Sequence, residues 1–176
     1  MQSMLNRSSC FSFCVAVVLT GTAASAQAGL RANFFEGAPK DRFQIRNESG
    51  CVLKDAEVLV DLSTSSAGLI FDVTDRGAGV EVYQPLEMVA GSKALTNIPN
   101  VEDGQSSIRL KVAELEPGEA IAFTIDVDDT LGTRAITVSG AEIAGASVSI
   151  MQDGSSSSGV FTERAEVTLP VAGCDI

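Results

Sequence analysis

Three carboxylates stand close together in this chain and are its best candidates for chemistry. Asp126, Asp128 and Asp129 lie at the end of Ala120–Thr130, a segment whose side chains alternate between apolar and polar. A period of two is typical of a strand with one buried face, so the segment predicts a core strand that runs into an acidic loop. Calcium prefers six to eight hard oxygen ligands, often from loops. The three aspartates are therefore candidate calcium ligands.

A calcium site needs more oxygens than these. Asp126 and Asp128 share one face of the expected strand, roughly 7 Å apart at Cα, so the strand must bend or a neighbouring loop must contribute. If an ion binds, we expect Asp126–Asp129 to lie beside Asp72 and Asp75, which flank Val73-Thr74 in a similar strand-to-loop position, or beside Glu36. The competing interpretation is that the acids are solvated, cap turns, or pair with Arg31, Arg42, Arg46, Arg109 or Arg134.

Most enzymatic chemistry is excluded by composition. The chain has no His, no Trp and a single Tyr, Tyr83. Without imidazole, neither a Ser–His–Asp nor a Cys–His arrangement can be built, nor a histidine-based metal site. Paired carboxylates can hydrolyse a glycosidic bond, but sugar sites generally use aromatic platforms, which are scarce here. We expect a protein that is not an enzyme, with a two-carboxylate hydrolase as the remaining catalytic alternative.

The apolar pattern predicts an all-β fold. No window carries a helical stripe, and short alternating segments recur between turn residues. This spacing favours an antiparallel immunoglobulin-like β-sandwich, with a jelly-roll-like fold as the alternative. The expected strands are Arg31–Glu36, Asp41–Asn47, Glu57–Leu62, Leu69–Thr74, Val80–Gln84, Ser107–Val112, Ala120–Thr130, Arg134–Ser139, Ser147–Met151 and Val160–Leu169, with a further short strand near Met88 or Ala94.

Two polar segments are interpreted as connections. Asp153–Gly159 is rich in serine and predicts a mobile hairpin loop. Asn47-Glu48-Ser49 has the form of a glycosylation sequon, but we interpret it as a plain turn.

The N-terminus has the form of a secretory signal peptide. Arg7 is its only charge, Cys10–Leu19 is apolar, and small residues before Gly29 suit cleavage. The apolar run is too short to span a membrane. We therefore expect export to the periplasm or the extracellular space and a single domain over residues 29–176. Cys51 and Cys174, the two cysteines that remain, are expected to pair in an oxidising compartment.

The charge of the chain bears on its partners. Its formal net charge is −11, which becomes −12 when the signal peptide with its one arginine is removed. Such a surface repels the phosphates of nucleic acid and the headgroups of anionic membranes. It suits solubility or cation binding.

Several blocks of the mature sequence resemble small secreted bacterial proteins labelled "aggregation factor core protein". The blocks are Asn33–Phe43, Gly68–Thr74, Gly77–Val82 and Phe123–Thr130. The label borrows from sponge cell-aggregation factors, large glycosylated assemblies that act with calcium; this chain is much shorter and lacks their repeated modules. The resemblance implies an exported adhesive or matrix-associated β-sandwich. It brings no catalytic residue, and the calcium ligands named above come from the acid cluster alone.

Two functions follow as hypotheses. The first is a non-enzymatic sandwich that mediates adhesion or aggregation with surface or matrix proteins or glycans, stabilised by calcium. The alternative is a periplasmic binding module for a glycan or small molecule, which predicts a concave site near Tyr83 and residues 85–105.

Overall fold

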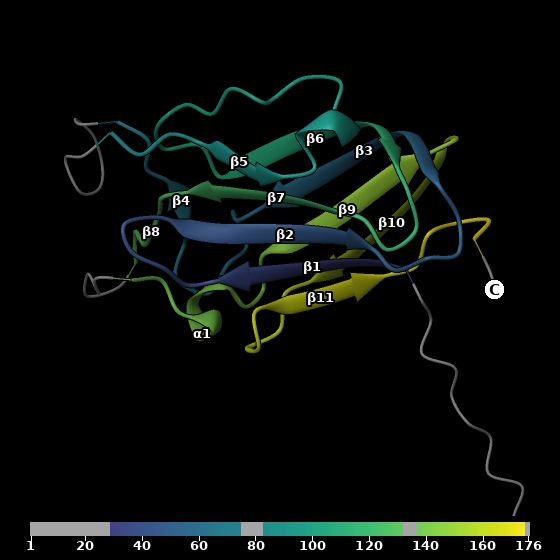
Figure 1. The fold of residues 1–176 in the computed structure, drawn as a ribbon. Coiled ribbons are helices and arrows are strands. Elements are labelled where there is room, and N and C mark those ends of the chain that lie inside the picture. Colours follow the sequence, from purple (N-terminus) through teal and green to yellow (C-terminus); the bar gives the residue numbers. More distant parts are fainter. Residues whose placement is uncertain (1–28, 75–82, 132–136, 175–176) are drawn as a thin grey trace, which may run out of the picture.

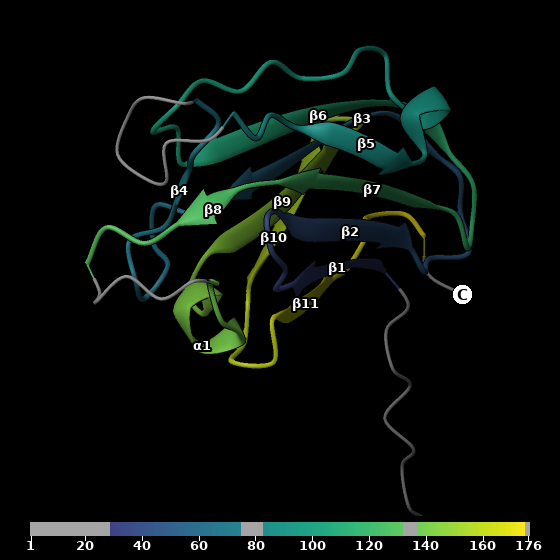
Figure 2. The ribbon, with the colours of Figure 1, turned by 60° about the vertical axis from the view of Figure 1, so that its left-hand side comes forward.

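The computed structural model describes residues 29–74, 83–131 and 137–174. Two antiparallel sheets pack face to face in the described part of the chain (Figures 1 and 2). The strands are β1 (Leu30–Phe35), β2 (Asp41–Asn47), β3 (Leu53–Asp61), β4 (Ile70–Phe71), β5 (Glu87–Ala90), β6 (Ser107–Leu115), β7 (Ala120–Ile125), β8 (Val127–Asp128), β9 (Ser147–Gln152), β10 (Ser155–Val160) and β11 (Glu166–Leu169). The helical segments are α1 (Gly140–Ile143) and the single 3-10 turn η1 (Ser92–Ala94).

The order of the strands confirms the predicted antiparallel sandwich. One sheet has the order β11-β1-β2-β7-β5, the other has the order β10-β9-β3-β6, and β4 pairs with β8 in a small ribbon at one end. The arrangement β1-β2-β7-β5 against β3-β9-β10 corresponds to the ABED and CFG sheets of the immunoglobulin fold. Strand β6 departs from that plan because it follows β5 in the chain yet pairs with β3.

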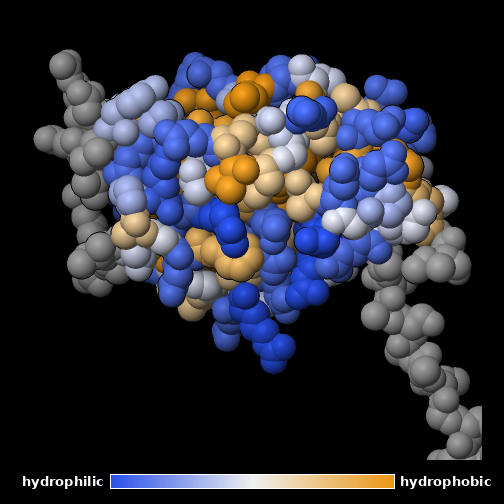
Figure 3. Space-filling view, viewed as in Figure 1, coloured by the Kyte–Doolittle hydropathy of each residue, from blue (hydrophilic) through white to orange (hydrophobic). Residues whose placement is uncertain are grey.

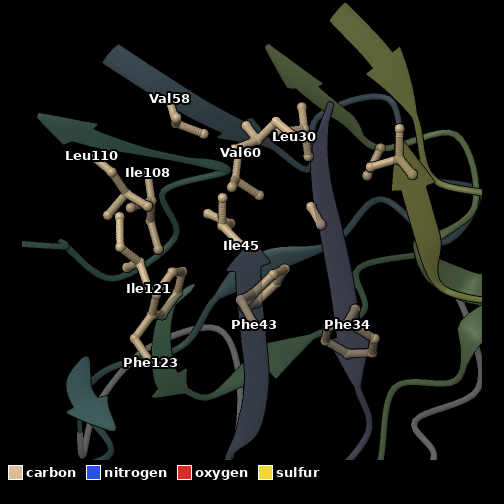
Figure 4. Close-up of a cluster of buried hydrophobic side chains, with 14 of the residues drawn as sticks. Leu30, Phe34, Phe43, Ile45, Val58, Val60, Ile108, Leu110, Ile121 and Phe123 are labelled. Atoms are coloured by element: carbon tan, nitrogen blue, oxygen red, sulfur yellow. The ribbon is translucent and has the colours of Figure 1, made fainter. Parts of the chain in front are cut away.

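Alternation along the strands decides which side chains form the core. In β2, the side chains of Phe43 and Ile45 are buried, whereas Arg46 on the other face of the strand is exposed to solvent. The ring of Phe43 lies 5.1 Å from that of Phe34 on β1 and 5.3 Å from that of Phe123 on β7, measured between centroids. Figure 4 shows this aromatic group beneath aliphatic side chains from both sheets. The contact between the sheets is therefore continuous and apolar.

Most expected strands are found where alternation placed them. Strand β2 has the predicted bounds, and the ends of β1 and β9 lie within one residue of the predicted ends. Strand β3 begins four residues before its predicted start, and β6 ends three residues after its predicted end. The short strand expected near Met88 is β5, whereas Ala94 belongs to η1. The predicted strand Leu69–Thr74 is reduced to two residues in β4.

The predicted strand Ala120–Thr130 is not continuous. Strand β7 ends at Ile125 and β8 begins at Val127, so the chain leaves the first sheet at Asp126. Strand β7 pairs with β2 and β5, while β8 pairs with β4. The alternation persists through the break because Val127 is again buried, which is why the sequence pattern does not reveal it.

Two predictions near the C-terminus are wrong. The serine-rich segment expected as a mobile loop forms β10, which pairs along its length with β9 across a tight turn at Asp153 and Gly154. The predicted strand Val160–Leu169 is interrupted after Val160 by a turn, where Ala165 donates to the Thr162 carbonyl. Backbone pairing in the sheet outweighs the poor strand propensity of serine in β10.

Some predictions fall on residues outside the described ranges. They include the signal peptide over residues 1–28 and most of the strands expected at Val80–Gln84 and Arg134–Ser139. The described ends of those two segments, 83–84 and 137–139, form no strand. Within the described ranges, no helix has the length and apolar character needed to cross a membrane.

The Asn47-Glu48-Ser49 segment is a buried turn, as interpreted from the sequence. Asn47 has no exposed surface, and its Nδ2 donates to the carbonyls of Cys51 at 2.7 Å and Leu115 at 3.0 Å. Its Oδ1 accepts from the hydroxyl of Ser49 at 2.6 Å. The side chain therefore fastens the β2–β3 connection to the end of β6 and is not presented to a glycosylating enzyme.

The predicted Cys51–Cys174 disulfide is present. The two residues have Cα atoms 5.5 Å apart and are separated by 123 positions in sequence. The bond joins the segment after β11 to the start of β3, so that it ties the C-terminal end of the first sheet to the second sheet.

We expect removal of this bond to destabilise the domain strongly. Replacing both cysteines by serine (Cys51→Ser with Cys174→Ser) should lower the free energy of unfolding by about 4–5 kcal/mol, because the unfolded chain regains the entropy of a long closed loop. Urea denaturation followed by circular dichroism measures the change. Wild-type protein under reducing conditions is the matched control and should unfold at the same urea concentration as the variant. An unchanged midpoint in both would contradict the structural role of the bond.

Candidate functional site

The ribbon of β4 and β8 brings two acidic segments together at one end of the sandwich (Figure 1). Ile70 pairs with Asp128 and Phe71 with Val127, and the N–H of Asp72 donates to the carbonyl of Asp126 at 3.1 Å. Asp72 and Asp126 are therefore neighbours, as expected if these acids share a function. Asp75 lies outside the described residues.

A glycine fixes the connection that enters β4. Gly68 has a φ of +64°, and a Cβ there would lie 2.7 Å from the hydroxyl oxygen of Thr130. The Thr130 hydroxyl donates to the Gly68 carbonyl at 2.7 Å, and the N–H of Leu131 donates to the carbonyl of Ala67. The chain on either side of the ribbon is thereby held in close contact, which only glycine allows.

A third segment, which sequence reasoning missed, lies on the other side of β4. The N–H of Gly104 donates to the carbonyl of Phe71 at 2.9 Å, and the N–H of Phe71 donates to the carbonyl of Gln105 at 2.8 Å. These bonds place Asp103 against Asp72, and Asp103 Oδ1 accepts from the N–H of Val73 at 3.2 Å. The Asp103-Gly104 pair reads as an ordinary turn in the sequence, and nothing in it signals a partner some thirty positions earlier.

Asp72 is the most unusual acid of this group. Its residue is 1% exposed, and neither carboxylate oxygen has a hydrogen-bond donor. Its polar neighbour is the carboxyl of Asp103, so their contact becomes a hydrogen bond only when a proton is present. Burial, followed by this hydrogen bond and by the charges of Asp103, Asp126 and Asp128, raises the pKa of Asp72 to about 6. The pKa of Asp103 is lowered: desolvation opposes this, but hydrogen bonds led by the one to Asp72 outweigh it.

The three aspartates singled out in the sequence occupy different surroundings. Asp126 is half-buried at the break between β7 and β8, and burial together with the charge of Asp128 raises its pKa to about 6. Asp128 is half-buried, and its Oδ1 accepts from the N–H of Asp129 at 2.9 Å. Asp129 is 8% exposed, and its backbone N–H is the donor to Asp128. The structure thus groups Asp126 and Asp128 with Asp72, and Asp129 follows Asp128 directly in the chain.

A fourth acid, Asp41, is buried for a structural reason. It is 2% exposed at the start of β2, and its carboxylate accepts from the backbone N–H groups of Gly37, at 3.0 Å, and Val127. Burial outweighs these bonds, and with the charges of Asp126 and Glu36 it raises the pKa of Asp41 to about 7. Asp41 has backbone N–H donors and closes a turn. Asp72 has no donor to offset the cost of burying its carboxylate.

The acids do not form a finished metal site. Among the described residues, no three Asp, Glu or Cys side chains converge closely enough to hold an ion. The chemistry of the donor set fits calcium, because the ligands on offer are hard oxygens and Asp72 has two orphaned ones. An ion here would need water molecules or a shift of side chains to complete its coordination.

A pocket of about 370 Å³ opens beside this cluster. Its lining comes mainly from the segment that leads into β5 and from the loop that precedes β6, near Tyr83 and within residues 85–105 as the sequence predicts for a concave site. Its lining residues are Val73, Thr74, Tyr83, Pro85, Leu86, Pro99, Asn100, Val101, Glu102 and Asp103. Asp103 belongs to both the pocket and the acid cluster.

A larger hollow of about 600 Å³ lies between η1 and the β6–β7 turn. It is lined by Gly91, Ser92, Lys93, Ala94, Glu114, Glu116, Glu119 and Ala120. These residues include no aromatic side chain. The Tyr83 pocket is therefore the better candidate site in spite of its smaller volume.

Comparison of the chain with protein-family models, with curated proteins and with solved structures finds no match.

The buried acids predict an inverted dependence of stability on pH. Asp41, Asp72 and Asp126 have pKa values of about 6 to 7 in the folded state, against 3.8 when unperturbed. The folded state therefore binds more protons than the unfolded state between these values, so the free energy of unfolding falls as the pH rises from about 5 to 7. Calorimetry without calcium should show a lower melting temperature near pH 7 than near pH 5.

Asp72→Asn should remove part of this slope, because an amide cannot ionise. Asp153→Asn is the matched control, since Asp153 is exposed in the β9–β10 turn at the opposite end of the molecule (Figure 1). Equal or greater stability of the wild type near pH 7 would contradict the prediction.

Proposed function

We propose that this protein is an exported, non-enzymatic β-sandwich that mediates surface or matrix adhesion or aggregation, with calcium neutralising the acidic end. The observation that carries the proposal is the buried Asp72 carboxylate, which lacks a donor and lies among Asp103, Asp126 and Asp128. An uncompensated buried charge is costly and needs a proton or a cation. The resemblance to the aggregation factor core proteins supports the adhesive part of the proposal.

We propose that the adhesive surface lies at the end of the sandwich that carries the β4–β8 ribbon and the Tyr83 pocket. Loops at the ends of immunoglobulin-like sandwiches are frequent recognition sites because a rigid scaffold positions them. On the face of the first sheet seen in Figure 3, hydrophobic side chains lie scattered among hydrophilic ones. The end with the acid cluster and the Tyr83 pocket combines charge, an exposed aromatic ring and a hollow, which favours it over that sheet face.

Calcium would be held by Asp72, Asp126 and Asp128, with water completing its shell. Asp72 supplies the two orphaned oxygens, and the others lie across the β4–β8 pairing. Because no three acids converge, we expect weak binding, of the order of 10⁻⁴–10⁻³ M as in extracellular calcium modules. Asp129, which the sequence also suggested as a ligand, adjoins this set through its neighbour Asp128.

A catalytic role is not proposed. A glycosidase needs two carboxyl groups about 5–10 Å apart, whereas the carboxyl groups of Asp72 and Asp103 adjoin each other. The two acids therefore do not lie on opposite sides of a scissile bond.

A second candidate function is a periplasmic binding module for a glycan or small molecule. The Tyr83 pocket favours it, because the pocket combines an aromatic ring, apolar walls and a few polar groups. This function does not require the acid cluster to bind calcium.

Calcium should stabilise the mature chain near neutral pH. At a calcium concentration ten times its dissociation constant the gain is about 1.4 kcal/mol, or roughly 3–5 °C in melting temperature for a domain of this size. Asp126→Asn and Asp128→Asn should each reduce the shift, and Asp153→Asn should leave it unchanged. Calorimetry at millimolar calcium measures it. No shift in the wild type, or the same shift with magnesium and in all variants, would refute the calcium site.

Adhesion is tested with the mature chain displayed on beads. We expect the beads to cluster with each other, or to bind the surface of cells that produce the protein, in millimolar calcium and to separate when the calcium is chelated. Beads that carry Asp126→Asn should adhere less than beads that carry Asp153→Asn. Beads that neither cluster nor bind such cells, with or without calcium, would refute the adhesive function.

A further inference from the structure

The pocket beside Tyr83 has an unusual balance of charge. Its ionisable lining residues, apart from the tyrosine itself, are the two acids Glu102 and Asp103, and its described lining contains no basic side chain. The ammonium of Lys40 lies nearby but is occupied, because it donates to the Pro85 carbonyl at 3.1 Å and pairs with Glu87 at 2.8 Å. The described lining of the pocket therefore presents negative charge.

The walls of the pocket are apolar and include an aromatic ring. Tyr83 is 69% exposed, and Pro85, Leu86, Pro99 and Val101 surround the same hollow. An exposed tyrosine ring attracts a cation that lies over its face. Apolar walls suit the methylene chain that carries such a cation.

The carboxylates of the lining also favour a ligand that donates hydrogen bonds. Glu102 and Asp103 carry acceptor oxygens when they are ionised. An ammonium group has three donors and no acceptor, so it complements these oxygens.

We propose that the Tyr83 pocket binds an alkylammonium ion, either a free amine or the side chain of a lysine on a partner. In this site Glu102 and Asp103 face the positive charge, the ring of Tyr83 covers it, and the proline, leucine and valine side chains contact the methylene groups. A volume of about 370 Å³ is close to the lower limit for small-molecule sites, and it suits a ligand the size of one long side chain. The inference rests on the second function proposed above and names its ligand class.

The test uses the fluorescence of the protein itself. Tyr83 is the only tyrosine and the chain has no tryptophan, so tyrosine emission reports on this pocket alone. The probes are a matched pair, Nα-acetyl-lysine amide and Nα,Nε-diacetyl-lysine amide, which differ only in the side-chain charge. Cadaverine tests the free amine, and methyl glucoside tests a neutral glycan. We expect saturable changes with the lysine amide or cadaverine, and none with the diacetyl compound or the glucoside.

The variants separate the charge from the ring. Glu102 is exposed, so Glu102→Gln should fold normally and weaken binding by about tenfold through loss of a charge-assisted contact. Tyr83→Leu keeps an apolar wall and removes the ring, and calorimetric titration should show weaker binding. Glu114→Gln, on the surface near the η1 hollow, is the matched control and should bind as the wild type does.

The same titrations distinguish a free amine from a lysine side chain, and they show which of the two proposals fails. Tighter binding of the lysine amide than of cadaverine would support a protein partner, and the reverse would support a free amine. Equal binding of the charged and diacetylated lysine amides would overturn the inference. Binding of the glucoside alone would overturn it while leaving a binding module, and no binding of any probe would overturn both. The calcium shift of the melting temperature is measured separately and is unaffected by these outcomes.

Discussion

Burial of Phe71 determines the arrangement at the acidic end. The ring is fully buried and lies 6.2 Å from the ring of Phe43 between centroids. Its backbone is bonded to Gly104 and Gln105 on one side and lies opposite Val127 on the other. Because Phe71 is held in place by these contacts, the next residue, Asp72, is also held in a buried position. Its carboxylate has no hydrogen-bond donor there. The hydrophobic gain at Phe71 offsets part of the cost at Asp72.

The buried carboxylate of Asp72 therefore makes the acidic end electrostatically unfavourable. Asp41 is equally buried but accepts from two backbone N–H groups, and its role in the turn between β1 and β2 is complete. Asp72 has Asp103 and Asp126 as neighbours, which add to the cost. Groups of this kind are retained where a protein uses them. Cations at the acid cluster and in the adjoining Tyr83 pocket would relieve the same excess of negative charge, so we infer that one physical property links the two proposed sites.

The sequence predicts the sandwich well and the site in part. Alternation identifies strands such as β2 because one face of each is buried, and the two remaining cysteines identify the disulfide. The serine-rich β10 was missed because its strand is imposed by pairing with β9 and not by its own residues. The acidic tract at 126–129 lies at the end of the fold where Asp72 is also found. Asp103 could not be predicted, because its meeting with Asp72 depends on how the loop before β6 packs against β4.

The most direct test of the central claim is the titration of Asp72 itself. Carbon-13 NMR of the side-chain carboxyls, assigned with the Asp72→Asn variant, measures the pKa of each aspartate with and without calcium. We expect Asp72 to titrate at about 6 in the metal-free protein and at a lower pH in millimolar calcium. A metal-free Asp72 that titrates near its ordinary value of 3.8 would contradict the claim that this carboxylate is buried without compensation.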